Sequence, residues 1–301
     1  MWKGRAKVIM ALLMWNVVCS SASATENGLM TYPNGVNTVL NGVLPKPGDT
    51  RFYNYSQYYI ANTFVGDDGA SLIPDFKVSV FAEAPRIVHT WGKGLGPFSL
   101  ASGIIVPVLH VSLDVAGTNS KKTGLGDIIL QPLFIGYSNS KHTFFAFAVT
   151  DVGVPTGAYS RNRAANTGVN YYSFWPNVDL TWFPTRNWEA SVSALAEFHT
   201  KNAATDYQSG AVAEVDYHVG YSIRHDLQLG VQGYFIRQFS DDKVGGAKFF
   251  NGFRGRANAV GPQLRYDLKP GVGFVLKFQK EFQVENRARG QKIWIQFSAP
   301  L

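Results

Sequence analysis

Hydrophobic and polar residues alternate with a period of two through most of this chain. Between residues 188 and 199, Trp188 and Val192 fall on one face, whereas Glu189 and Ser193 fall on the other. Such alternation over several residues is typical of β-strands that are apolar on one side and polar on the other. The same pattern recurs in residues 211–224, 227–235 and 272–283.

About twelve such segments are present, and each is about as long as a tilted membrane-spanning strand. We therefore predict an all-β fold, a transmembrane antiparallel up-and-down β-barrel of about 12 strands. The predicted strands begin near Arg51, Asp75, Phe98, Asp127, His142, Asn170, Asn187, Gly210, Asp226, Gly255, Val272 and Arg289.

The connections between these segments alternate in length. Short connections rich in turn residues occupy 138–141, 184–187, 224–226 and 267–271. Longer polar connections occupy 65–74, 117–126, 155–169, 201–209, 240–254 and 285–289. Outer-membrane barrels have short periplasmic turns and long outer loops, so this pattern predicts that both termini face the periplasm.

The first 24 residues have the pattern of a secretory signal peptide. Three basic residues precede a short apolar stretch, and Ala22-Ser23-Ala24 supplies small residues for cleavage near Ala24. We predict three regions: a signal peptide over 1–24, an N-terminal segment over 25–50, and the barrel over 51–301. The predicted location of the mature protein is the outer membrane of a Gram-negative bacterium.

Composition narrows the class of protein further. The chain has 301 residues, of which 46% are hydrophobic and 16% charged. That hydrophobic content excludes a disordered chain, and its single cysteine excludes a disulfide scaffold. Removal of the signal peptide takes away three of the 28 basic residues, and the charge that remains is too modest to predict nucleic-acid binding.

A soluble lipocalin-like barrel or β-sandwich would also alternate. Two features favour the membrane barrel instead. Charged residues recur on the polar face, where a closed soluble core could not solvate them. Aromatic residues crowd the strand ends, as in the interfacial girdles of membrane barrels; they include Tyr53, Tyr55, Tyr58, Tyr59, Trp91, Tyr171, Tyr172, Phe174, Trp175, Trp182, Trp188 and Trp294.

The segment from Thr25 to Asp49 is rich in Asn, Gly and Pro, with aliphatic residues dispersed through it. Two interpretations are open for this region. It is either a periplasmic lead or a segment that folds into the barrel and plugs its lumen.

Polar residues on the predicted inner face are candidates for lining the lumen. Their charges are mixed, unlike the single-sign ring of an ion-selective pore. Individually they would pair across strands and keep the lumen wet; as a set they would form a polar path for a solute. The candidates are Glu83, His110, Ser112, Asp179, Glu189, Glu197, Glu214, Asp216, His218, Arg265, Lys277, Glu281 and Lys292.

His110-Val111-Ser112 is the one sequence that hints at an enzyme, because outer-membrane lipases and deacylases carry a His and a Ser close together on a strand. His-x-Ser also arises often by chance, and ordinary polar residues are the favoured interpretation. The sequence has no nucleophile elbow, phosphate-binding loop or zinc-type Cys/His spacing. We therefore predict no catalytic residues, no metal and no cofactor.

Several short motifs rich in Gly and Pro recur along the chain. They are Tyr32-Pro33-Asn34-Gly35, Pro45-Lys46-Pro47-Gly48, Thr123-Gly124-Leu125-Gly126-Asp127-Ile128, Val154-Pro155-Thr156-Gly157-Ala158-Tyr159 and Ala259-Val260-Gly261-Pro262-Gln263-Leu264. Together they resemble a bacterial family of outer-membrane transporters of the phenol meta-degradation pathway. The resemblance covers nearly all of the mature chain. It implies an outer-membrane channel for aromatic or other hydrophobic compounds, and it supplies no catalytic residues.

The predicted function is passive uptake of small hydrophobic or aromatic solutes through a monomeric barrel in outer-membrane lipid. Loops 155–169 and 240–254 would control the outer mouth. Three alternatives remain open: a barrel lipid hydrolase or deacylase, a closed structural barrel, and a soluble lipocalin-like carrier.

Overall fold

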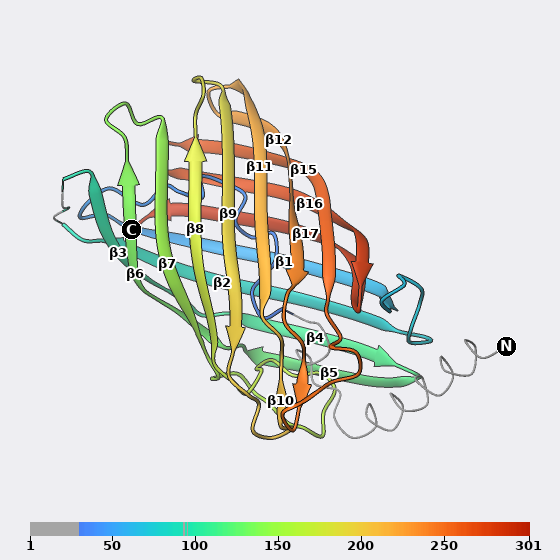
Figure 1. The fold of residues 1–301 in the computed structure, drawn as a ribbon. Coiled ribbons are helices and arrows are strands. Elements are labelled where there is room, and N and C mark those ends of the chain that lie inside the picture. The colour runs from blue at the N-terminus through green and yellow to red at the C-terminus, as the bar shows by residue number, and fades with distance from the viewer. Residues whose placement is uncertain (1–29, 93, 95) are drawn as a thin grey trace.

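A computed structural model describes residues 30–92, 94 and 96–301 as a closed antiparallel barrel of twelve strands (Figure 1). The predicted fold class is therefore confirmed, whereas the signal peptide lies outside the described residues and stays a prediction. The barrel strands are β1 Thr50–Val65, β2 Lys77–Thr90, β3 Phe98–Ile105 continued by β4 Val108–Val115, β5 Thr118–Leu125 continued by β6 Ile128–Ser138, β7 Phe144–Val154, β8 Ser173–Trp182, β9 Trp188–His199, β11 Val212–Arg224, β12 Leu227–Gln238, β15 Arg256–Lys269, β16 Val272–Glu285 and β17 Arg287–Pro300.

No helix among the described residues is long and apolar enough to cross a membrane.

The first and last strands close the barrel. β1 pairs with β17, so that Tyr58 lies opposite Ile293, and on its other edge it pairs with β2, so that Tyr58 lies opposite Phe81. In Figure 1 the wall formed by β7, β8, β9 and β11 crosses the wall formed by β1, β2, β16 and β17 at a steep angle. Such crossing follows from the tilt that strands adopt when a sheet closes on itself.

The two ends of the barrel differ. One end, which we call the turn end, holds the short connections 139–143, 183–187, 225–226 and 270–271, together with the C-terminus. The opposite end, which we call the loop end, holds the connections 66–76, 155–172, 200–211 and 239–255. Three two-residue strands occur in the last two of these loops: β10 Tyr207–Gln208, β13 Lys243–Val244 and β14 Ala247–Lys248.

Two predicted loops are wrong. Residues 117–126 contain the strand β5, which pairs with β4 through a tight turn at Ala116 and Gly117. Both residues have positive φ, as two-residue hairpin turns require. The predicted loop at 285–289 is a turn at Asn286 alone. Both segments were predicted to be loops because most of their residues are polar.

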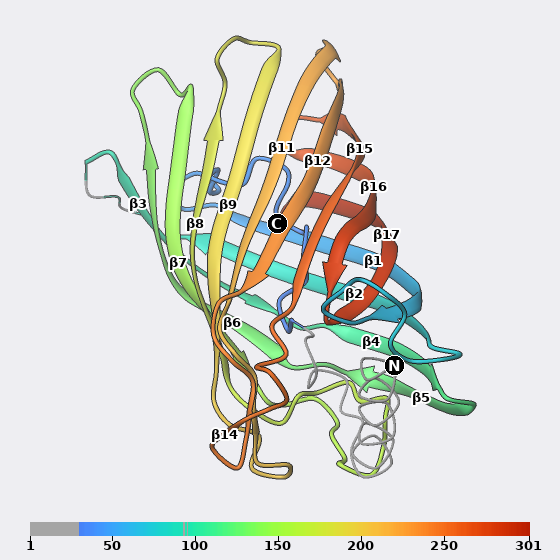
Figure 2. The same cartoon turned by 45° about the vertical axis from the view of Figure 1, so that its right-hand side comes forward.

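β5 pairs with β4 alone, and its other edge lies away from β7 (Figure 2). The loop 155–172 lies beside this edge: the Ala165 amide donates to Ser120 Oγ at 3.1 Å. Asp127, between β5 and β6, accepts from the amides of Gly157 and Val169, each at 2.8 Å. This loop therefore covers part of the edge that strand pairing leaves free.

The outer face of the barrel is apolar. Val231, Ile295 and Leu276 are each about half exposed there, as lipid-facing residues of a barrel are. Trp182 and Trp188 lie on this face near the turn end. Six aromatic residues predicted for the interfacial girdle instead line the interior cavity: Tyr53, Tyr55, Tyr59, Tyr171, Trp175 and Trp294.

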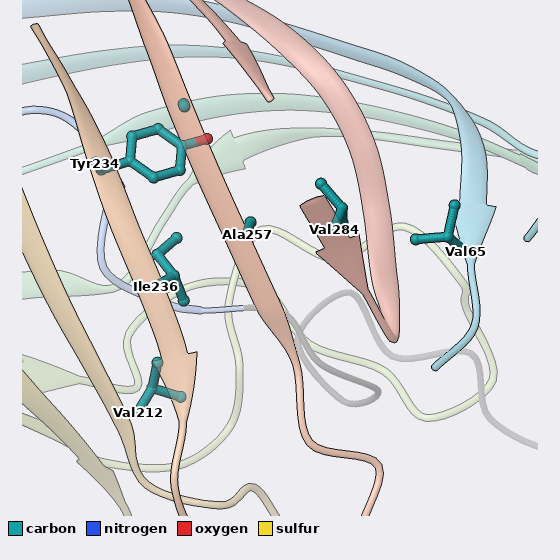
Figure 3. Close-up of a cluster of buried hydrophobic side chains, with 7 residues drawn as sticks. Val65, Val212, Tyr234, Ile236, Ala257 and Val284 are labelled. Carbon is teal, nitrogen blue, oxygen red and sulfur yellow. The ribbon is translucent and has the colours of Figure 1, made fainter. Parts of the chain in front are cut away.

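Apolar side chains also gather inside the barrel near the loop end (Figure 3). This cluster comes from five strands, and Met30 packs against it. Its members are Val65, Val212, Tyr234, Ile236, Ala257, Ala259 and Val284.

Candidate functional site

Residues 30–49, which we call the plug segment, run through the interior of the barrel from the loop end to the turn end. Near the loop end the Thr31 amide donates to Glu197 Oε1 at 2.8 Å. Near the turn end the Gly42 amide donates to Thr181 Oγ1 at 3.1 Å, and the Gly48 amide donates to the Thr90 carbonyl at 2.9 Å. Of the two interpretations of this segment, the structure has the folded-in one.

Carboxylates of the barrel wall accept hydrogen bonds from backbone amides of the plug segment. The Gly35 amide donates to Glu214 Oε1 at 3.0 Å and to Asp216 Oδ1 at 3.1 Å. Asp216 Oδ2 accepts from the amide of Asn37 at 2.9 Å. Irregular backbone inside a barrel needs such partners, because an unpaired buried amide is costly.

Lysines on the opposite side hold the carbonyl groups of the same turn. Lys277 Nζ donates to the carbonyls of Gly35 and Val36 at 2.7 and 2.9 Å, and to Thr38 Oγ1 at 2.7 Å. Lys292 Nζ donates to the Asn34 carbonyl at 3.0 Å. Carboxylates thus accept hydrogen bonds from the amide groups of this turn, and ammonium groups donate hydrogen bonds to its carbonyl groups. We call this arrangement the plug clamp.

Gly35 bonds to both sides of the plug clamp, and neighbouring side chains leave no room for a Cβ atom there. Its φ is +75°, and a Cβ built there would lie 2.2 Å from Gln279 Nε2 and 2.7 Å from Tyr234 Cδ1. Only glycine adopts this conformation without strain and fits this space. Gly35 of the Tyr32-Pro33-Asn34-Gly35 motif is therefore required where the plug segment turns against the barrel wall.

Two further carboxylates of the inner face, those of Glu189 and Glu281, also have hydrogen-bond partners. Glu189 Oε1 accepts from the Leu40 amide at 2.9 Å, and its Oε2 accepts from Arg265 Nη1 at 2.6 Å. Glu281 accepts from Tyr234 Oη at 2.6 Å and from the Gly290 amide at 2.7 Å.

A cavity of about 1050 Å³ lies beside the plug segment, and its lining includes residues from both ends of the barrel. Near the loop end its wall is apolar, and we call this part the apolar chamber. Alternate residues of β2 and β4 project into the chamber, and aromatic rings from β1 and the loops complete it. The lining there includes Val78, Val80, Leu109, Val111, Leu113, Val115, Phe64, Phe76, Phe249 and Phe253.

A polar belt crosses the wall between the apolar chamber and the turn end. Arg86 Nε donates to Gln131 Oε1 at 2.7 Å, and Arg86 Nη1 donates to Tyr55 Oη at 3.1 Å. Gln131 Nε2 in turn donates to both carboxylate oxygens of Asp151 at 3.0 Å. The Arg86 guanidinium also lies 5.4 Å from the centre of the Tyr53 ring.

Three of the candidate lumen residues point to the outside of the barrel. Glu83 accepts from Asn54 Nδ2 and Ser56 Oγ, both at 2.8 Å, on the face opposite to the cavity-lining residues of β2. His110 and Ser112 likewise alternate with the cavity-lining residues of β4, and His110 Nδ1 lies 2.6 Å from Thr123 Oγ1. The assignment to the lumen was wrong because β2 and β4 turn apolar side chains inward to form the chamber.

The remaining ten candidates have inward, largely buried side chains. The plug clamp and its neighbouring ion pairs bring nine of them together around the plug segment: Glu189, Glu197, Glu214, Asp216, His218, Arg265, Lys277, Glu281 and Lys292. Asp179 stands apart, with both carboxylate oxygens lacking a hydrogen-bond partner among the described residues.

The sequence prediction missed the polar belt and the apolar chamber. One signal was present: in β2 the residues Val78, Val80, Ala82 and Ala84 alternate with Ser79 and Glu83. Within the described residues, no group of three or more His, Cys, Asp or Glu side chains could hold a metal ion.

Comparison with solved structures defines the fold as that of an outer-membrane barrel. An outer membrane channel from Pseudomonas putida F1 superposes with a TM-score of 0.78 at 16% identity, covering 88% of this chain and 100% of that one. The transport unit of the autotransporter AIDA-I from Escherichia coli gives a TM-score of 0.55 at 8% identity, covering 87% of this chain and 93% of that one. The beta domain of the Bordetella autotransporter BrkA gives 0.53 at 10% identity, covering 85% and 100%.

A family model places the chain more closely. The family described as "Putative MetA-pathway of phenol degradation" matches residues 61–297. The chain therefore belongs to this family, which confirms the resemblance seen in its motifs. A search of curated proteins gave no match.

Proposed function

We propose that this protein is a monomeric channel of the Gram-negative outer membrane that admits small hydrophobic or aromatic solutes by diffusion. The single observation that carries the proposal is the apolar chamber. Val80, Val111 and Leu113 replace, on the inner face, the polar residues that a water-filled barrel usually turns inward. Burial of apolar surface is favourable by about 25 cal/mol per Å², so such a chamber concentrates apolar solutes.

The plug segment restricts the part of the lumen that is open to a solute. It occupies the lumen on the side of β9–β17, and the cavity runs beside it past the polar belt. Solutes entering the chamber would pass along the plug segment toward the turn end. Hydrated sugars would gain no compensating contacts in the chamber, because its lining offers them few hydrogen-bond partners.

The family description names phenol degradation, which agrees with an aromatic cargo. The mechanism requires no catalysis, and we propose that the protein is not an enzyme. His110 and Ser112 lie outside the cavity, so the solute path does not involve them.

Swelling of liposomes that contain the refolded protein tests the proposal. Catechol and resorcinol should enter faster than arabinose, relative to protein-free liposomes. Equal entry of all three would contradict selectivity for aromatic solutes, and entry of none would favour a closed structural barrel.

A further inference from the structure

The inward side chains of β8 fall into two groups. At the two ends of the strand, Ser173 and Thr181 bind the plug segment, with Thr31 Oγ1 donating to Ser173 Oγ at 3.1 Å. Between them lie Trp175, Asn177 and Asp179, which line the cavity. In the middle of the strand the Tyr32 ring of the plug segment lies 5.7 Å from the Trp175 ring, centroid to centroid, while Asn177 and Asp179 line the cavity beside it.

Each of these three central side chains has polar atoms without a hydrogen-bond partner in the part of the chain that the structure describes. The atoms are Trp175 Nε1, Asn177 Oδ1 and both carboxylate oxygens of Asp179. All three side chains are at least 95% buried, with exposed fractions of 2%, 5% and 1%. Unpaired buried polar groups cost free energy, so a row of them on a cavity wall calls for a partner from outside the chain.

Apolar and aromatic groups surround this row. On the neighbouring strand, Phe147 lies directly opposite Asp179 and Val149 opposite Asn177. The Phe147 ring packs edge-on against Phe134 at 5.1 Å between centroids. The wall therefore combines hydrogen-bond acceptors with a surface for a flat apolar ring.

We propose that Asp179 and Asn177, with Phe147 beside them, bind hydroxylated aromatic solutes such as phenols. The hydroxyl group donates to the Asp179 carboxylate while the ring packs against Phe147. Trp175 Nε1, two inward positions nearer to the loop end, meets the hydroxyl oxygen earlier along the path. This inference rests on the proposed function, because the solute reaches β8 through the same cavity.

Other ligands fit the row less well. An anionic solute would face the carboxyl group of Asp179. Asp151, the nearby carboxylate of the polar belt, is less available to any solute because it already accepts two hydrogen bonds from Gln131. A metal ion would need more ligands than the described residues supply here. A neutral hydroxyl group donates one hydrogen bond and brings an apolar ring, which matches both halves of the wall.

Titration of 4-fluorophenol and 4-fluoroanisole, followed by ¹⁹F NMR with the protein in lipid nanodiscs, tests the proposal. 4-Fluoroanisole carries a methyl group in place of the hydroxyl hydrogen and so cannot donate a hydrogen bond, and empty nanodiscs correct for the partition of each solute into lipid. The hydrogen bond that only the phenol can donate predicts about ten-fold tighter binding of the phenol. Asp179→Leu should abolish this preference and leave the binding of 4-fluoroanisole within about two-fold of the original value.

Glu83→Gln is the matched control, because it removes a carboxylate on the outer face and should keep the preference. Asp179→Asn retains one acceptor oxygen and should keep part of the preference if Asp179→Leu does not fold. A preference that survives in Asp179→Leu, or equal binding of the two solutes, would overturn the site but leave the proposed function intact. Tighter binding of 4-fluorobenzylammonium than of the phenol would overturn it in favour of a cation site. Binding of neither fluorinated aromatic would instead contradict the proposed function itself.

Discussion

Replacement of Lys277 by Met should release the plug segment. Lys277 is 1% exposed, and its ammonium group donates to two carbonyl groups and one hydroxyl group of the segment. Methionine has a similar volume and no donor, so the change removes the hydrogen bonds with little change in packing.

The magnitude follows from these contacts. Hydrogen bonds to a charged group are worth about 1.5–3 kcal/mol each. Gln279 and Gln296 still donate to the Gly35 and Val36 carbonyls, so the loss is smaller than the sum of three bonds. We take about 3–5 kcal/mol, the range found when one partner of a buried charged contact is removed. That loss shifts the equilibrium of the plug segment toward release by about a hundred- to several thousand-fold.

Single-channel recording in planar bilayers measures the effect. Lys277→Met should open to larger conductance levels, or open far more often, than the original protein. Lys141→Met, in an exposed turn, changes the same side chain outside the lumen and should behave like the original protein. The clamp account is refuted if Lys277→Met forms a folded, heat-modifiable barrel whose conductance and amide protection over residues 33–38 are unchanged.

Three further predictions concern the plug segment, the chamber and the outer face. Gly35→Val should also raise conductance, because its Cβ would overlap Gln279 and Tyr234; unchanged recordings would show that this turn does not seat the segment. Leu113→Asp should lower catechol entry into liposomes by roughly five-fold, since about 1 kcal/mol of apolar contact is lost. Leu113→Met keeps an apolar side chain and should leave entry unchanged. Equal entry rates for Leu113→Asp and the original protein would show that the solute path does not include the chamber. His110→Leu and Ser112→Ala should leave catechol entry unchanged and should not alter hydrolysis of a lipid ester, because both side chains face outward. Loss of an esterase activity in either variant would instead support the barrel hydrolase.

The strands of this barrel could be predicted well from the sequence because alternation is a local property. In β9 and β11 the outward face is apolar and the inward face polar, so Glu189 and Glu214 were placed on the correct side. The turn residues near 184–187 and 267–271 fixed the ends of neighbouring strands. A strand such as β5, with the sequence Thr-Asn-Ser-Lys-Lys-Thr-Gly-Leu, carries no apolar face and was predicted to be a loop.

The candidate site could be predicted only in part, because alternation reveals two faces without saying which one is inside. Glu83 and Ser112 were assigned to the lumen on the rule that polar residues face inward. That rule fails where the cavity itself is apolar, as along β2 and β4. The partners of Lys277 and Asp216 could not be foreseen either, since they lie on backbone about 180 or more residues away in sequence.

Uptake by cells tests the central claim most directly. Radiolabelled phenol and arabinose, each at micromolar concentration, would be supplied to a Gram-negative strain that lacks general porins and expresses either this protein or a closed control barrel. We predict that this protein raises the initial rate of phenol uptake and leaves arabinose uptake at the control level. An increase for arabinose alone, or for neither solute, would contradict an aromatic-selective channel.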